Sequence, residues 1–187
     1  WLYNRFRFLD SKYITGNSMA TRIMIRAHSK ANVWLTSYVN MYGHVYYNEE
    51  IAEHRMERGK PYEYVWTASG AEDTVIGIND ADMLTSIGDL SGLQVETIDI
   101  AKAIHLTSLK IGDASDSYEN KNLKTVTFGN NTLLRTIDLR NCSGLQTSLD
   151  IAGCTNVEHV YCEGTSITGI KLPSGGVLKT LHLPDTV

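Results

Sequence analysis

The sequence predicts a mainly β protein, in which a small antiparallel β-sandwich-like domain over residues 1–75 precedes a short solenoid of stacked coils over residues 76–187. Three observations predict this fold class: an uneven distribution of aromatic residues, a series of short β-prone runs in the first part, and an internal repeat in the second. The chain of 187 residues is 42% apolar and 20% charged, which is typical of a globular protein.

The composition changes near residue 75. Thirteen of the sixteen Phe, Trp and Tyr residues lie in residues 1–75, which carry nine Lys or Arg against eight Asp or Glu, while the remainder carries eight against thirteen. This change predicts two domains with a boundary near Ala71–Thr74. The net charge of −4 lacks the basic excess that phosphate contacts require, so we expect no nucleic-acid partner. No run of 18 apolar residues occurs, so we expect no membrane insertion.

Short runs of β-branched and aromatic residues, separated by Gly, Pro and Ser, predict the strands of the first domain. Residues 49–57 are expected to form a strand as well, with one or two helical turns as the alternative. A short helix or an edge strand is expected within residues 1–10. The other predicted strands are Ile23–Ala27, Val33–Val39, His44–Tyr47 and Tyr62–Trp66.

The second domain repeats a unit with apolar residues at its start and 2, 8, 11 and 13 residues later. Each unit offers only one thin apolar face, so it must stack on its neighbours to bury that face. A weaker copy of the unit begins at Ile76. Asp89 stands at its last apolar position, so this copy is expected to be a cap or a transition coil. With it the domain has about five coils. The steps between units are 22, 28, 23 and 21 residues, and the longest step predicts a protruding loop over residues 112–122. The four full units are Ile98, Ile100, Leu106, Leu109 and Ile111; Val126, Phe128, Leu134, Ile137 and Leu139; Leu149, Ile151, Val157, Val160 and Cys162; and Ile170, Leu172, Leu178, Leu181 and Leu183.

The segment Leu134–Cys142 matches the core pattern of leucine-rich repeats, in which Asn or Cys follows the strand. Residues 149–170 resemble the short leucine-rich repeats of gut bacterial surface proteins. The resemblance covers residues 76–187 and implies a leucine-rich-repeat-like solenoid. In the other coils the turn position departs from the pattern and is Ala114, Thr165 and Thr186, so no continuous Asn ladder is expected.

Residues 3–13, 37–43 and 177–184 resemble a family of minor structural, tail-associated proteins from phages of gut bacteria. The resemblance implies a non-enzymatic virion component of the tail, assembled in the bacterial cytoplasm. Its implied partners are other virion proteins or copies of itself, and a glycan or protein of the host cell surface. The alternative is a bacterial cell-surface leucine-rich-repeat adhesin. A third hypothesis, a tail-associated hydrolase, needs paired carboxylates that the sequence does not place.

The residue chemistry predicts no catalytic, cofactor-binding or metal-binding residues. The three Cys residues fit neither a disulfide framework nor a zinc site, and Cys142 and Cys162 are expected to be small buried apolar groups. Residues 50–54 come closest to an inverted zincin helix, but Glu50 stands where the first His is needed, so a solvated acidic turn is expected there. The acidic residues of segment 113–119 lack the order of a Ca²⁺ loop, and an ordinary exposed loop is expected.

A surface strip is the remaining candidate for function. The residues that flank the inward side chain of the later strand in each coil are expected to point outward, side by side on successive coils. An aromatic and hydrogen-bonding strip of this kind is a surface that repeat proteins use for partners or glycans. Plain solvent exposure is the alternative. The candidate binding residues are Lys110, Asp138, His159, Tyr161, Thr180 and His182.

Overall fold

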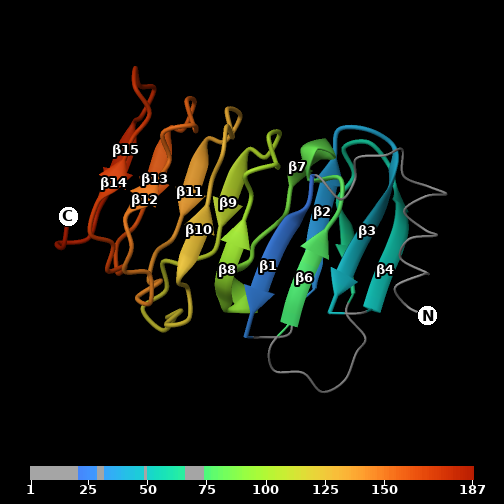
Figure 1. Ribbon diagram of the computed structural model, residues 1–187, viewed down its shortest axis with the longest axis horizontal. Helices are drawn as coiled ribbons and strands as arrows, with labels where there is room; N and C mark the ends of the chain where they lie inside the picture. The colour runs from blue at the N-terminus through green and yellow to red at the C-terminus, as the bar shows by residue number, and fades with distance from the viewer. Residues whose placement is uncertain (1–20, 29–31, 49, 66–73) are drawn as a thin grey trace.

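The computed structural model describes residues 21–28, 32–48, 50–65 and 74–187. These residues form fifteen strands and two short 3₁₀ helices, so the prediction of a mainly β protein is confirmed (Figure 1). In chain order the elements are β1 (Ile23–Ala27), β2 (Val33–Ser37), β3 (Met41–Tyr47), β4 (Glu50–Met56), β5 (Tyr62–Tyr64), β6 (Thr74–Ile78), η1 (Ala81–Met83), β7 (Leu84–Ser86), η2 (Ser91–Leu93), β8 (Val95–Asp99), β9 (Ser108–Lys110), β10 (Thr125–Thr127), β11 (Thr136–Asp138), β12 (Leu149–Asp150), β13 (His159–Tyr161), β14 (Ile170–Lys171) and β15 (Thr180–His182).

The strands predicted before residue 66 are present as β1 to β5. The strand predicted over residues 49–57 is β4, which pairs along its whole length with β3, so both the helical alternative and the acidic turn are wrong. The segment 1–10, Trp66 and residues 71–73 of the predicted boundary lie outside the described residues.

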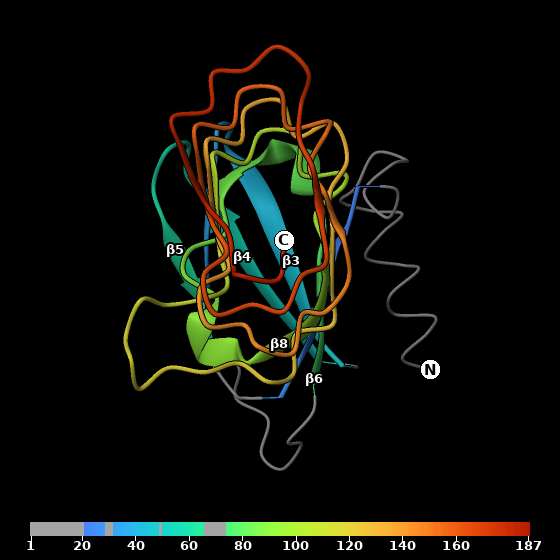
Figure 2. The same ribbon diagram turned by 90° about the vertical axis from the view of Figure 1, so that its left-hand side faces the viewer.

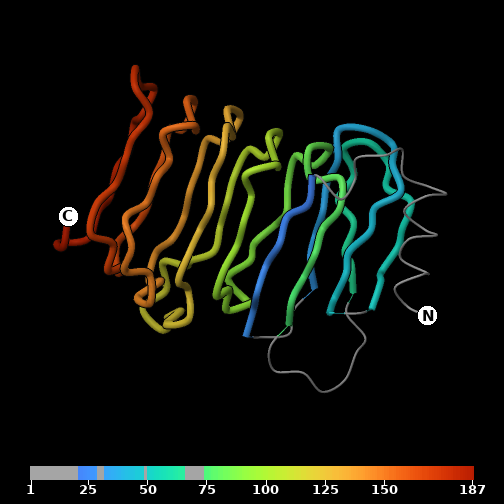
Figure 3. The backbone as a smooth tube through the Cα atoms, viewed as in Figure 1, coloured from blue at the N-terminus to red at the C-terminus, as the bar shows by residue number. Residues whose placement is uncertain are grey.

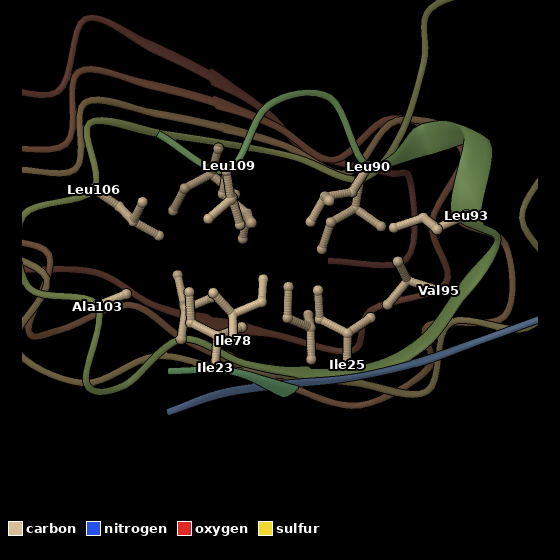
Figure 4. Close-up of a cluster of buried hydrophobic side chains, with 14 of the residues drawn as sticks. Ile23, Ile25, Ile78, Leu90, Leu93, Val95, Ala103, Leu106 and Leu109 are labelled. Atoms are coloured by element: carbon tan, nitrogen blue, oxygen red, sulfur yellow. The ribbon is translucent and has the colours of Figure 1, made fainter. Parts of the chain in front are cut away.

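The strands lie in two layers that face each other across the core. One layer is a six-stranded sheet in the order β10-β8-β1-β6-β3-β4, continued along the chain by the pair β12-β14. The other contains β5-β2-β7 and the four-stranded sheet β15-β13-β11-β9. Leu106 and Leu109 of the second layer point across the core toward Ile23 and Ile78 of the first (Figure 4). Alternation of buried and exposed residues in β1 and β2 explains this packing, because one face of each strand lies against the core.

β8 joins the antiparallel and the parallel parts of the molecule. It pairs antiparallel with β1 and parallel with β10, whereas the strand pairs among β1 to β7 are antiparallel. In the opposite layer, Asp89 forms a parallel bridge with Lys110 of β9, just after β7. The buried apolar side chains therefore form one cluster, from Ile23 to Ile167, across the predicted domain boundary.

The register of the repeat agrees with the predicted spacing. Ile137 pairs with Leu109 on one side and with Val160 on the other, and all three are fully buried. Successive turns of the chain overlie one another when the molecule is viewed from its C-terminal end (Figure 2), and lie side by side in the perpendicular view (Figure 3). The last coil departs from the prediction: Leu172 is 38% exposed, because within the described residues no strand covers the outer edge of β14.

The turns between strands stack as closely as the strands. A Cβ atom on Gly144 would lie 2.1 Å from the carbonyl oxygen of Lys121, so only glycine allows the two turns to approach this closely. The predicted loop over residues 112–122 extends from the side of the coils (Figure 2), and residues 114–117 within it are exposed. Asn120, in contrast, is fully buried and anchors the return of the loop.

Candidate functional site

The predicted strip lies on the four-stranded parallel sheet of β9, β11, β13 and β15. Parallel pairing in register sets side chains of successive coils next to one another, and the pairing is continuous across all four strands. The strip consists of two rows that run across the strands. One row is Lys110, Asp138, Tyr161 and His182, and the other is Ser108, Thr136, His159 and Thr180.

Lys110 begins the first row between two carboxylates. Its ammonium nitrogen lies 3.0 Å from Asp89 and 3.1 Å from Asp113. The hydrogen bond to Asp89, followed by the one to Asp113, raises the pKa of Lys110. Asp89, which takes the place of an apolar residue in the weak first copy of the repeat, therefore extends the row by one coil. This end of the strip has a fixed cation and an excess of negative charge.

Asp138 differs from the prediction that it points into solvent, because only 5% of its surface is exposed. Arg140, two residues later, covers it with a two-pronged contact: Nε donates to Oδ1 at 3.0 Å and a terminal nitrogen donates to Oδ2 at 2.7 Å. The same guanidinium lies 4.9 Å from the centre of the Tyr161 ring. Asp138 therefore orients the arginine, and the arginine and the tyrosine form the accessible surface here.

Tyr161 is the centre of the strip. Its ring lies edge-on to His182, with centroids 5.4 Å apart, and parallel to the ring of His159 at 6.3 Å. His182 is held by a hydrogen bond of 2.5 Å from Nδ1 to Glu163, and Nδ1 of His159 is 3.0 Å from the hydroxyl of Thr180. The structure therefore brings together five of the six predicted residues, with Tyr161 at their centre, and the sixth, Lys110, lies on β9, beyond β11.

Glu158 forms a second ionic cluster at the start of the same strands. Its carboxylate accepts hydrogen bonds from Arg135 at 2.7 Å and from Lys179 at 2.6 Å, which are contributed by the coils on either side. The bond from Lys179 lowers the pKa of Glu158 most, followed by the bond from Arg135. The cluster links three coils and borders His159, whose Nε2 lies 4.0 Å from the same carboxylate.

Sequence reasoning missed Arg140, Glu158 and Glu163, although they complete the strip. Each of them lies immediately before or two residues after an outward strand position. A search for opposite charges one repeat apart finds Glu158 between Arg135 and Lys179, which are 23 residues before it and 21 after it. The contact between Arg140 and Asp138 is local and carries no repeat signal.

The thiols are poor candidates for chemistry. Cys142, Cys154 and Cys162 are fully buried, and burial raises the pKa of each thiol to about 12. Because the thiolate is the nucleophile, such thiols are protonated and inert at neutral pH. This agrees with the expected role of Cys142 and Cys162 as small buried apolar groups.

The described residues contain no group of three or more His, Cys, Asp or Glu side chains that could hold a metal ion. The carboxyl of Asp113 in the acidic loop accepts a hydrogen bond from the amide of Ser115 and another from Lys110, and these two bonds lower its pKa. The carboxyl of Glu119 contacts Ser143 and Lys121 instead. The groups that the strip presents are ionic, aromatic and hydrogen-bonding side chains.

Comparison with known proteins finds no matching family model, no matching curated protein and no matching solved structure. Among the described residues, no helix has the length and apolar character needed to cross a membrane.

Proposed function

We propose that the chain is a non-enzymatic structural and adhesion module of a phage tail, which presents a repeat surface for assembly or for binding to the host cell. In this proposal the C-terminal coils form a leucine-rich-repeat-like solenoid, and the preceding strands form a sandwich-like domain that supports it. The single observation that carries the proposal is the aligned strip of Arg140, Tyr161, His159 and His182 on adjacent coils. The tail location rests on the resemblance of the three short segments to phage structural proteins.

The contacts within the strip favour a binding role. Tyr161 is only partly buried, yet its ring is bordered by a guanidinium and two imidazoles that are themselves held by Asp138, Thr180 and Glu163. Side chains held in place before binding lose less conformational entropy when a partner docks. Aromatic and arginine side chains are also the groups that carry most of the binding energy in protein interfaces.

A bacterial cell-surface adhesin is the second candidate. It is favoured by the pairing of Leu149–Asp150 with Ile170–Lys171 one coil later, because this is the segment that resembles the repeats of gut bacterial surface proteins. The two candidates share a binding strip and differ in the neighbouring genes. Virion genes on either side favour the tail protein, and a secretion signal with a sorting tail favours the adhesin.

The proposal is tested by replacing His159, Tyr161 and His182 together with serine. None of the three belongs to the apolar register, so we expect the melting temperature to change by only a few degrees, while attachment of the fluorescently labelled chain to a panel of gut bacterial isolates is lost. The matched control replaces Lys102, Leu133 and Thr155 with serine, because these are three exposed turn residues that precede β9, β11 and β13 and lie outside the strip. Attachment of the strip variant at the level of this control would contradict the binding role.

A further inference from the structure

A groove interrupts the layer opposite the strip. There β10 is the outer strand of the six-stranded sheet and β12 is the outer strand of a separate pair, and within the described residues the two do not pair with each other. Across the core, β11 and β13 of the same two coils pair in full register. The opening is therefore confined to one layer, and it encloses a groove of about 400 Å³ between β10, β12 and Lys171 of β14.

Two apolar residues, Val126 and Phe128, line the groove among mostly polar groups. Val126 and Phe128 take the same repeat positions as Ile98 and Ile100 in the coil before, which are 2% and 0% exposed. Val126 and Phe128 themselves are only partly buried and line the groove. The register of the repeat predicts that Val126 and Phe128 are completely buried. Their partial exposure therefore results from the absence of pairing between β10 and β12, since the spacing of the unit itself is regular. Phe128, which also packs against the buried core, therefore contributes partly exposed aromatic surface to the groove.

The rim of the groove is polar and has no net charge. Asp150 and Lys171 form an ion pair of 3.5 Å in which both side chains are about two-thirds exposed, and such a pair is weak enough to rearrange around a ligand. Ser148 and Asn130 add a hydroxyl and an amide. Leu149 and Ile151 donate their backbone amides toward β14, to Gly169 and Lys171, so the alternate residue Asp150 turns its peptide groups toward the groove.

The shape of the groove excludes a long extended peptide. At one end Gly153 is so close to Gly129 that a Cβ atom on Gly153 would lie 2.2 Å from the Gly129 carbonyl oxygen. The coils are closed at that end, and a strand inserted between β10 and β12 could not continue through it. The volume falls within the range of about 300–1,000 Å³ that is typical of small-ligand sites.

From this geometry we propose that the groove binds a neutral oligosaccharide built from hexose or N-acetylhexosamine units. The C–H face of a sugar ring packs on Phe128, and its hydroxyl groups exchange hydrogen bonds with Asp150, Asn130, Ser148 and Lys171. The balanced charge of the rim favours a neutral sugar over an acidic one. This inference rests on the proposed adhesion function, for which it names a substrate class and a second surface distinct from the strip.

Phe128 provides the probe for the test. The chain has only three Phe residues, Phe6, Phe8 and Phe128, so protein labelled with 4-fluorophenylalanine gives three ¹⁹F resonances, and the variant Phe128→Leu identifies the third. We titrate the labelled full chain with maltohexaose, cellohexaose, mannohexaose and chitohexaose, with hexagalacturonic acid as the charged control. We expect at least one neutral sugar to shift the Phe128 resonance in a saturable manner.

Two variants assign the binding to the groove. The double variant Asp150→Asn with Lys171→Met keeps the acceptor for the Ala152 amide and is expected to weaken binding at least tenfold, measured by the same titration. Phe128→Leu keeps an apolar side chain in the groove and is expected to weaken binding to a similar degree by calorimetry. The triple serine variant of the strip should bind the sugar as the parent does.

Two outcomes would overturn the inference: no response to any neutral sugar, or a response to hexagalacturonic acid alone. A negative result for sugar binding in the groove can be distinguished from a negative result for the proposed adhesion function. If the groove variants lose the sugar but still attach to cells, the groove is dispensable for attachment. If only the strip variant loses attachment and no sugar binds, the adhesion role stands and the groove assignment is wrong.

Discussion

At the residue scale, Ile137 shows how completely the repeat depends on its inward positions. It is fully buried between Leu109 and Val160 of the adjacent coils. Ile137→Asp places a carboxylate in this row without a partner, so we expect the free energy of unfolding to fall by more than about 3 kcal/mol. Ser108→Asp, at an exposed outward position of β9, should change it by less than about 0.5 kcal/mol. Urea denaturation measures both, and equal stability of the two variants would show that the register is wrong.

Side chains in the apolar register could be predicted from sequence, and their polar neighbours only in part. The spacing of the repeat identifies Ile137 and Val160 as inward residues, because alternation along a strand fixes which face each side chain takes. The spacing also predicts that Asp138 faces away from the core. The side chain does lie on the outer face of β11, but the spacing gives no information about the group that covers its carboxylate. Arg140 folds back over Asp138 from the following turn, and its χ angles are not encoded in a periodic pattern.

At the element scale, the long connection before β10 combines an exposed tip with a buried anchor. Residues 114–117 are exposed, whereas Asn120 is fully buried, donates to the carbonyl of Val95, and accepts from the amides of Asn122 and Leu123. The 28-residue step predicts the protrusion, but it cannot predict the anchor, since an asparagine in a polar loop gives no signal of burial.

The two parts of this connection should respond differently to change. Deleting residues 114–117 is expected to lower the free energy of unfolding by less than about 1 kcal/mol, because loop length affects stability only weakly. Asn120→Ala leaves one buried carbonyl and two amides without their partner and is expected to cost about 2–3 kcal/mol. Thermal and urea denaturation provide the comparison. A larger loss from the deletion than from Asn120→Ala would mean that the tip, and not Asn120, holds the loop in place.

The groove between β10 and β12 is an element-scale feature that the sequence does not reveal. The four full units have identical internal spacing, so the register predicts that Val126 and Phe128 are as buried as Leu149 and Ile151 in the next coil, which are 2% and 0% exposed. Whether adjacent coils pair depends on the geometry of the connections on either side. These connections vary in length, and their conformation is set by local contacts such as the close approach of two stacked turns at Gly144.

At the scale of the whole molecule, the core is continuous but its protection is uneven. The change in composition predicts a boundary near residue 75, while the buried side chains form one cluster on both sides of it. At the other end, Leu172 and Val177 are 38% and 44% exposed, and the remaining apolar residues of the last coil are only partly buried. Stacked repeats gain stability mainly from their nearest neighbours, so the last coil should open most easily.

The three buried thiols report the order of this opening. Burial raises the pKa of Cys142, Cys154 and Cys162 to about 12, so the thiolate needed for alkylation is scarce at pH 8 until a coil opens. If opening spreads from the C-terminal coil, iodoacetamide should label Cys162, which follows β13, first, Cys154 next and Cys142 last, as resolved by peptide mass spectrometry. In denaturant the three should react at the same rate. Equal rates in native buffer would show instead that the coils that hold these thiols open together as a single cooperative unit.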